Sequence, residues 1–234
     1  MIQPEQQRRA YLEALGIDVW VPRGEPEPEV AAEAVDEAVD ARSAPPTRDG
    51  LDWPALRDAV AGCTQCALHE TRTQTVFGVG NESADWMIIG EAPGAEEDRR
   101  GEPFVGRAGK LLDEMLRAVG QGRDKVFIAN ILKCRPPNNR DPKPEESAQC
   151  RGYLGRQIEL VQPRIILAVG RIAAQLLLDT DAPVGRLRGK PHRLGDTPLV
   201  VTYHPAYWLR SPSQKRKSWD DLCLARRVAA GAAS

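Results

Sequence analysis

In Trp86-Met87-Ile88-Ile89-Gly90-Glu91-Ala92-Pro93-Gly94, a short apolar run leads directly into a glycine-rich turn. An apolar run without alternation predicts a strand that is buried on both faces, as in a parallel sheet covered by helices. Three similar runs follow at residues 126–129, 165–169 and 199–202. The sequence therefore predicts a four-stranded sheet.

Helical patterns separate these strands, at residues 108–119, 145–161 and 172–178, and another follows the last strand at 214–229. A further helix is expected to begin after Leu51, with Asp52 as its cap and Pro54 in its first turn. Strands that alternate with helices predict an α/β fold: a three-layer sandwich whose central, mostly parallel four-stranded sheet is flanked by helices. No internal repeat is evident.

The charge is divided unevenly along the 234 residues. Residues 1–50 carry eleven acidic and five basic side chains, whereas residues 51–234 carry 22 acidic and 27 basic ones. Residues 24–49 are rich in Pro, Ala and Glu, a composition that cannot bury enough apolar surface to offset chain entropy. We therefore expect an N-terminal docking peptide and acidic, disordered linker at 1–50, followed by a folded domain at 51–234. The alternative is that the N-terminal helix packs on the domain.

Residues 186–227 hold ten basic and three acidic side chains. This excess indicates either a face that binds a polyanion or ordinary solvated surface. No apolar run is long enough to span a membrane, and charged residues occupy the place of a signal peptide's apolar core. A cytoplasmic protein without membrane contact is expected.

Chemically distinctive segments follow three of the predicted strands. Glu91 comes after the first strand, Asn130 after the second and His204 after the fourth. Ligands of open α/β sheets bind beyond the carboxyl ends of the strands, so these side chains are expected to meet at one edge. The segment after the first strand has neither a phosphate-binding Walker ending nor the dinucleotide-binding glycine pattern, which disfavours nucleotide hydrolysis and NAD chemistry.

The five cysteines predict a metal site and one spare thiol rather than disulfides. Cys63 and Cys66 have two residues between them, and Cys134 and Cys150 have 15. Four thiols can bind zinc or a [4Fe–4S] cluster, and their spacing alone leaves both open. Cys223 is expected to be a buried residue of the last helix.

Several motifs in order resemble the family 4 uracil-DNA glycosylases, which are iron–sulfur enzymes of the uracil-DNA glycosylase superfamily. These motifs are Gly-Glu-Ala-Pro-Gly at 90–94, Pro-Phe-Val-Gly-Arg-Ala-Gly at 103–109, Asn130 with Cys-Arg-Pro-Pro-Asn-Asn-Arg at 134–140, and His-Pro-Ala-Tyr-Trp-Leu-Arg at 204–210. The resemblance covers about residues 51–229. It implies a base-excision repair enzyme that hydrolyses the N-glycosidic bond of deoxyuridine in DNA and leaves an abasic site.

The resemblance also implies how uracil would be bound. Phe104 would stack on the extruded base, and the Asn130 amide would read O4 and N3 of its Watson–Crick edge. Gly90 lets the backbone approach the base closely. Glu97 would crowd the C5 position and exclude the methyl group of thymine.

The catalytic residues implied by the resemblance are His204, Glu91 and Asn139. His204 would donate a hydrogen bond to O2 of uracil, where negative charge develops. Glu91 would position the attacking water or stabilise the cationic sugar. Asn139 would support the loop or the water. No nucleophilic amine is needed, so a monofunctional enzyme is expected.

The segment after His204 is expected to contact DNA. The gap left by a flipped nucleotide would be filled by Trp208 or by Leu209, unless Trp208 packs on the final helix instead. Arg210 and Lys215 would contact phosphates.

The resemblance favours a [4Fe–4S] cluster on Cys63, Cys66, Cys134 and Cys150 over zinc. The expected partner is uracil-containing DNA, single- or double-stranded, bound by a monomer in the bacterial nucleoid. Leu15-Gly16-Ile17 with Trp20 also resembles the N-terminal peptide of the psi subunit of the bacterial clamp loader, so a replisome or repair protein is a further expected partner of residues 1–23.

Three rival functions are weaker. A covalent trap of uracil-DNA, as in another branch of the superfamily, needs a histidine after the second strand, and residues 131–143 contain none. An iron–sulfur protein that only senses DNA leaves Glu91, Asn130 and His204 unexplained. A nuclease or phosphatase with two metal ions would need clustered acidic residues, which are not evident.

Overall fold

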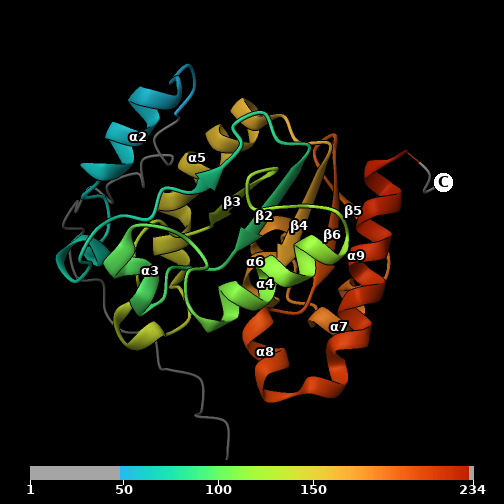
Figure 1. Ribbon diagram of the computed structural model, residues 1–234. Coiled ribbons are helices and arrows are strands. Elements are labelled where there is room, and N and C mark those ends of the chain that lie inside the picture. Colours follow the sequence, from blue (N-terminus) through green and yellow to red (C-terminus); the bar gives the residue numbers. More distant parts are fainter. Residues whose placement is uncertain (1–47, 232–234) are drawn as a thin grey trace, which may run out of the picture. The chain divides into compact units, whose positions relative to one another are not determined.

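The structure, a computed structural model, describes residues 48–231 (Figure 1). The predicted docking peptide at 1–23 lies outside the described residues, as does nearly all of the predicted linker at 1–50. Arg48, the first described residue, already contacts the domain, because it donates a hydrogen bond to the Tyr153 hydroxyl at 2.9 Å. No helix in the described part of the chain is long and apolar enough to cross a membrane.

Six strands form one sheet in the order β1-β3-β2-β4-β6-β5. The four inner strands β3, β2, β4 and β6 are parallel, and β1 and β5 pair antiparallel at the two edges. The strands are β1 Val79–Gly80, β2 Trp86–Gly90, β3 Val126–Asn130, β4 Ile165–Val169, β5 Pro191–Leu194 and β6 Thr197–Thr202.

The predicted α/β sandwich is confirmed, but the sheet has six strands rather than four. The two unpredicted strands lack the signal that identified the others. β1 has only two residues, and β5 has the sequence Pro-His-Arg-Leu with no buried side chain. An edge strand needs no continuous apolar run, because it is not covered on both faces like a central strand.

The predicted helices are present, and three short helices that the sequence patterns did not predict are additional: Ala95–Arg100, Val184–Leu187 and Pro205–Arg210. Asp52 caps the first described helix, where its carboxylate accepts a hydrogen bond from the Ala55 amide at 3.0 Å. The α-helices are α2 Trp53–Ala61, α3 Ala95–Arg100, α4 Arg107–Ala118, α5 Pro144–Val161, α6 Arg171–Leu178, α7 Val184–Leu187, α8 Pro205–Arg210 and α9 Lys215–Ala229; the 3₁₀ turns are Ala67–Glu70, Pro137–Asn139 and Pro212–Gln214.

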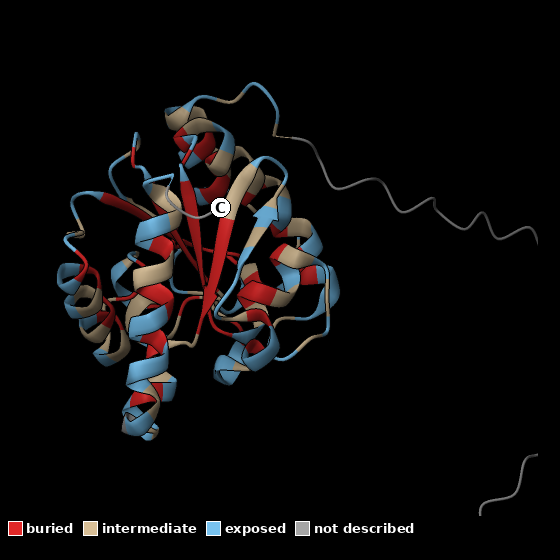
Figure 2. Cartoon of the chain, turned by 90° about the vertical axis from the view of Figure 1, so that its right-hand side faces the viewer, coloured by how far each residue is buried: buried red, intermediate tan, exposed pale blue. Residues whose placement is uncertain are grey.

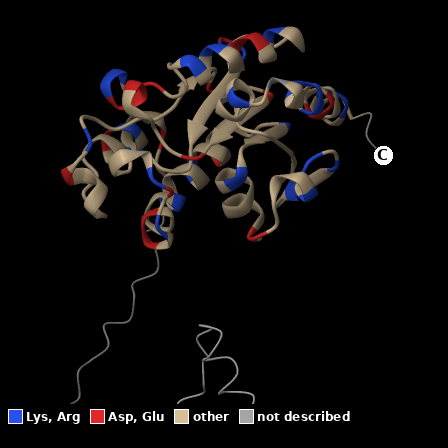
Figure 3. Cartoon of the chain, turned by 90° about the horizontal axis from the view of Figure 1, so that it is seen from below, with Lys and Arg blue, Asp and Glu red and all other residues tan. Residues whose placement is uncertain are grey.

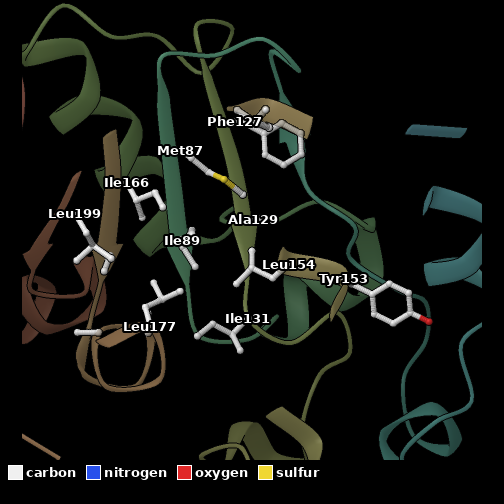
Figure 4. Packing of buried hydrophobic residues seen from close by; sticks show 14 of the residues in the cluster. Met87, Ile89, Phe127, Ala129, Ile131, Tyr153, Leu154, Ile166, Leu177 and Leu199 are labelled. Carbon is white, nitrogen blue, oxygen red and sulfur yellow. The ribbon is translucent and has the colours of Figure 1, made fainter. Parts of the chain in front are cut away.

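Alternate side chains of the inner strands pack into two cores, one on each face of the sheet. Met87 and Ile89 lie in the core under α2, α5, α6 and α7, part of which is shown in Figure 4. Trp86 and Ile88 lie in the core under α4 and α9. Figure 2 shows the buried strands between helices whose outer faces are exposed. The sheet is therefore the middle layer of three, as predicted.

The strand order places a ligand site at one edge of the sheet. The chain passes from β2 to β3 on one side, and β4 then pairs with the other side of β2. Such a reversal leaves a crevice at the carboxyl ends of the parallel strands, because the connections diverge there. Gly90 and Asn130 are direct partners in the β2–β3 register at this edge.

Candidate active site

A cleft of about 510 Å³ opens at the carboxyl ends of β2 and β3 and at the start of α8. The sequence correctly predicted that side chains after three strands would meet there. Seven predicted residues line the cleft: Glu91, Glu97, Phe104, Asn130, Asn139, His204 and Arg210. Among the other lining residues is Asp141, to which the sequence assigned no role because it lies outside the recognised motifs.

Asn130 ends β3 with a side chain that is only 2% exposed. Its Oδ1 is buried and has no hydrogen-bond partner among the described residues. A buried acceptor without a donor costs about 1–3 kcal/mol, so such an atom in a cleft indicates a site that a ligand completes. The Asn130 amide is thus placed to receive a donor from a bound molecule.

Gly90 lies directly beside Asn130 at the end of β2. A Cβ atom there would lie 2.4 Å from Oδ1 of Asn130 and 2.6 Å from Cζ of Phe104. Both distances are far below van der Waals contact, so only glycine lets the amide and the aromatic ring approach together. In the structure, Gly90 leaves the space that the Asn130 amide and the Phe104 ring occupy.

Phe104 presents its ring from a left-handed backbone conformation, with φ of 54°. Its ring and that of His204 are nearly parallel, with centroids 5.7 Å apart and planes at 29°. Gly109 in the first turn of α4 permits this arrangement, because a Cβ there would lie 1.7 Å from the Phe104 carbonyl oxygen. The motif at 103–109 therefore builds one aromatic wall of the cleft.

His204 caps α8, and its Nδ1 accepts a hydrogen bond from the Ala206 amide at 3.2 Å. The neutral ring then carries its proton on Nε2, which leaves a donor free for a ligand. Burial, helped by Arg210 and partly opposed by Glu97, lowers the pKa of His204 to about 4. His204 is therefore neutral at physiological pH.

Glu91 directly follows β2 and lines the cleft, and its pKa is unusual for a carboxyl group. Burial, helped by the nearby Asp141 carboxylate, raises the pKa of Glu91 to about 7. Arg171 acts in the other direction, and it forms an ion pair with Asp141 at 2.5 Å. A carboxyl group with a pKa close to 7 can take up or give up a proton under working conditions.

Glu97 holds the loop that carries Phe104. Its Oε1 accepts hydrogen bonds from the Val105 amide at 2.9 Å and the Gly106 amide at 3.0 Å. Sequence reasoning did not foresee this contact. The proposed exclusion of a methyl group by Glu97 stays a prediction, although the side chain does line the cleft.

Asn139 lies at the mouth of the cleft, where it is exposed. It ends the 3₁₀ turn Pro137–Asn139 with φ of 52°, and its Oδ1 accepts a hydrogen bond from Nε of Arg135 at 2.8 Å. Its position agrees with the predicted support of a loop.

The segment after His204 contains both candidates for a wedge, and they differ in exposure. Trp208 is only 1% exposed and lines a small cavity together with residues of α4 and α9, whereas Leu209 is 42% exposed. This burial disfavours Trp208 as a wedge, and its helix α8 packs mainly against α4 rather than against the final helix. Arg210 and Lys215 are exposed, as the predicted phosphate contacts require. Figure 3 shows basic and acidic segments interspersed on this side rather than one uniformly basic face.

The four predicted cysteine ligands line one small cavity, together with Arg72, Lys133 and Tyr153. Cys134 Sγ accepts a hydrogen bond from Arg72 at 3.1 Å. Burial raises the pKa of Cys66 and of Cys134, and it raises that of Cys150 to about 12. Buried thiols of this kind become thiolates when a cation compensates their charge, as a metal centre does.

In residues 48–231, no three His, Cys, Asp or Glu side chains are placed to share one metal ion. A cluster of four irons spaces its thiolates more widely than a single ion, since each thiolate binds a different iron. The shared cavity brings together the four sulfur ligands that either kind of metal centre would need. Cys223 does not line this cavity, but it is partly exposed on α9, so the prediction that it is buried is wrong. Its helix is amphipathic, and this position lies at the border of the apolar stripe.

Lys133 connects the cysteine cavity to the cleft, a link that sequence reasoning missed. It is 1% exposed, and its Nζ donates to the Asn130 carbonyl oxygen at 2.8 Å and to Gln157 Oε1 at 2.6 Å. Gln157 in turn donates to the Phe77 carbonyl at 2.9 Å. The buried ammonium thus anchors the end of β3.

Comparison with known proteins agrees with the fold and the cleft. A family model described as the uracil DNA glycosylase superfamily matches residues 77–224. The chain is 46% identical over 171 residues to the type-4 uracil-DNA glycosylase of Archaeoglobus fulgidus, which covers 70% of this chain and 86% of the relative. It is also 46% identical over 171 residues to that of Thermotoga maritima, covering 72% and 88%. A type-5 uracil-DNA glycosylase of Pyrobaculum aerophilum is 32% identical over 144 residues, covering 54% and 63%.

These matches and the cleft define the class of protein: an α/β enzyme of the glycosylase type, as the sequence motifs predicted. More particularly, the chain belongs to the type-4 uracil-DNA glycosylases of that superfamily. The family resemblance stated from the motifs is thereby confirmed.

Proposed function

We propose that the protein removes uracil from DNA by hydrolysing the N-glycosidic bond of deoxyuridine, which leaves an abasic site. One observation carries the proposal: the unpartnered Oδ1 of Asn130, the Phe104 ring and the free Nε2 of His204 share one cleft with Glu91. An acceptor, an aromatic face and a neutral donor are together what a planar, doubly carbonylated base requires.

Recognition of the base is assigned to Asn130 and Phe104. The Asn130 Oδ1 accepts the N3 proton of uracil, and its Nδ2 donates to O4. Cytosine presents an acceptor at N3 and an amino group at the position of O4, so both contacts fail. A site built around such a buried amide rejects the wrong partner strongly, because its own polar atoms would then stay unpaired.

His204 and Glu91 are assigned to bond cleavage. As the C1′–N1 bond breaks, its electron pair stays on uracil, and the Nε2 proton of His204 donates to O2, where the negative charge collects. One preorganised donor of this kind contributes about 2.7–4 kcal/mol. The Glu91 carboxylate stabilises the cationic sugar and accepts the proton of the water that attacks C1′. Asn139 holds the loop at the cleft mouth.

The target nucleotide leaves the base stack before cleavage, because a glycosidic bond inside a duplex is out of reach. Leu209 is the proposed wedge, supported by its exposure beside the cleft. Arg210, which lines the cleft, and Lys215 bind phosphates on either side of the extruded nucleotide.

Cys63, Cys66, Cys134 and Cys150 are proposed to bind a [4Fe–4S] cluster, in agreement with their shared cavity. The cluster would fix the segment before the sheet to the loop after β3, and hydrolysis needs no redox step from it. Purified protein should contain iron and acid-labile sulfide in equal amounts; zinc in their place would overturn the assignment.

The function is tested with a labelled oligonucleotide that contains a single U·G or U·A pair, with a T·A duplex as the control. Alkali should break the strand at uracil only after incubation with the enzyme, with or without EDTA. Without alkali the strand should stay whole, and borohydride should trap no adduct, since a monofunctional enzyme forms no imine. Intact DNA after alkali, or a stable protein–DNA adduct, would overturn the proposal.

A further inference from the structure

We propose that Arg123, which lies in the loop between α4 and β3, is a positioning residue that holds Phe104 in its base-stacking conformation. The inference rests on the proposed function, because it concerns how the aromatic wall of the cleft is kept in place. Arg123 lies outside every motif that the sequence analysis singled out.

Phe104 needs such support, because its backbone is strained. A non-glycine residue with positive φ costs about 1–2 kcal/mol relative to ordinary backbone, and Phe104 has φ of 54°. The side chain is also 7% exposed, so the ring is buried while the backbone is held in an unfavourable region. Strain of this kind persists only where surrounding contacts enforce it.

Arg123 donates hydrogen bonds to the carbonyl groups on both sides of the Phe104 Cα atom. Its Nη1 donates to the Phe104 carbonyl oxygen at 3.3 Å, and its Nη2 donates to the Pro103 carbonyl oxygen. One planar guanidinium thus holds two successive carbonyl groups. A lysine could not reproduce this, because its ammonium is a single point and not a fork.

Asp113 of α4 orients the guanidinium, with its Oδ1 at 3.0 Å from Nη1 of Arg123. The two side chains are 27% and 30% exposed, so water screens this pair less than it screens a fully exposed pair. All three acceptors of Arg123 therefore belong to the Phe104 loop or to the helix that follows it. No other role for this side chain is evident among the described residues.

Glu97 holds the same loop from its other end. Its carboxylate binds the amides of Val105 and Gly106, whereas Arg123 binds the carbonyls of the two preceding residues. The strained residue lies between a cationic and an anionic clamp. Release of either clamp lets φ relax and turns the ring away from its position 5.7 Å from His204.

The experiment compares Arg123→Met with the parent enzyme by two measurements: inhibition of excision by free uracil, and calorimetric binding of free uracil. We expect Arg123→Met to weaken uracil binding about tenfold in both, with a smaller decrease in kcat. Arg123→Lys should bind uracil with an affinity between those of Arg123→Met and the parent enzyme, because lysine restores one contact. Arg117→Met is the matched control, since Arg117 pairs only with the exposed Glu114 on α4.

A double-mutant cycle separates positioning from general stability. On a Phe104→Ala background, Arg123→Met should change uracil binding by less than twofold, because no ring is left to position. A tenfold loss on both backgrounds, or parent-like binding by Arg123→Met, would overturn the inference. If Arg123→Met does not fold, Arg123→Lys takes its place in the cycle. An equal loss of binding on both backgrounds, or parent-like binding by Arg123→Lys, would then overturn the inference. Parent enzyme that releases no uracil would instead overturn the proposed function.

Discussion

The cleft and the helical segment that follows it are adjacent at His204, yet they are built in opposite ways. In the cleft, Asn130 and Phe104 are almost completely buried, and short backbone approaches at Gly90 hold them in place. In the α8–α9 segment, Leu209 is exposed, as is Lys215. Burial with strict geometry is typical of discrimination and chemistry, whereas exposed apolar and basic side chains are typical of contact with a large polyanion.

Because the two regions differ in this way, substitutions in them should alter different measurable quantities. A change in the cleft should lower catalysis and leave affinity for DNA nearly intact. A change in the α8–α9 segment should alter DNA binding, strand preference or salt dependence. Four predictions test this division, and the expected effects decrease from the first to the last.

The largest effect is expected from Gly90→Ala. Its Cβ would lie 2.4 Å from Asn130 Oδ1 and 2.6 Å from the Phe104 ring, so both recognition groups must move. A displacement near 1 Å can lower catalysis about 100-fold, and we expect a loss of that size in single-turnover excision. Gly155→Ala is the matched control, since nothing lies within 4 Å of a Cβ in that part of α5. Equal activity of the two variants would contradict the close packing of the cleft.

The second prediction concerns pH. Burial raises the pKa of Glu91 to about 7, so the required carboxylate becomes scarcer as the pH falls below 7. We expect kcat/KM to decrease about tenfold for each unit below pH 6 and to level off above pH 8. His204 should add no transition near 6.5, because its pKa is lowered to about 4.

Two variants check the assignment of this transition. Glu91→Gln should abolish it along with most activity. Asp141→Asn should move it to lower pH, because a neighbouring negative charge is lost and Arg171 is released from its ion pair. A transition that stays near 7 in Glu91→Gln would show that another group controls the rate.

The third prediction distinguishes the two wedge candidates. Leu209→Ala should reduce excision from duplex DNA about tenfold and leave excision from single strands unchanged, because a single strand needs no gap filled. Trp208→Ala should instead lower the free energy of unfolding by about 3–5 kcal/mol, since it empties a buried site. Leu176→Ala removes another exposed leucine, on α6, and should affect neither substrate. A duplex-specific loss in Trp208→Ala without destabilisation would reverse the assignment.

Parts of the molecule that depend on local pattern could be predicted from the sequence. The inner strands were predicted because their apolar runs reflect burial on both faces. The convergence of Glu91, Asn130 and His204 was predicted because parallel strands end at one edge. The edge strand β5 was missed because its Pro-His-Arg-Leu sequence carries no such run.

Contacts between distant segments could not be predicted in this way. The left-handed backbone of Phe104 and its clamp by Arg123 depend on how α4 returns towards β3. The burial of Trp208 depends on α4, which lies far earlier in the chain and contacts α8. Residue type does not distinguish the buried side chain from the exposed one either, because Trp208 and Leu209 are both apolar and adjacent. Only the packing of the folded chain determines which of these two side chains is exposed.

The smallest effect is expected from Lys215→Ala, at the exposed start of α9. Loss of one phosphate contact should reduce the slope of log K against log salt by about 1 and weaken DNA binding about threefold to tenfold at low salt. Fluorescence anisotropy across a salt series measures both quantities. Lys125→Ala is the matched control, because this exposed lysine precedes β3 at the opposite end of the sheet. An unchanged slope in Lys215→Ala together with a lowered kcat would assign Lys215 to catalysis. It would contradict the assignment of the α8–α9 segment to DNA binding.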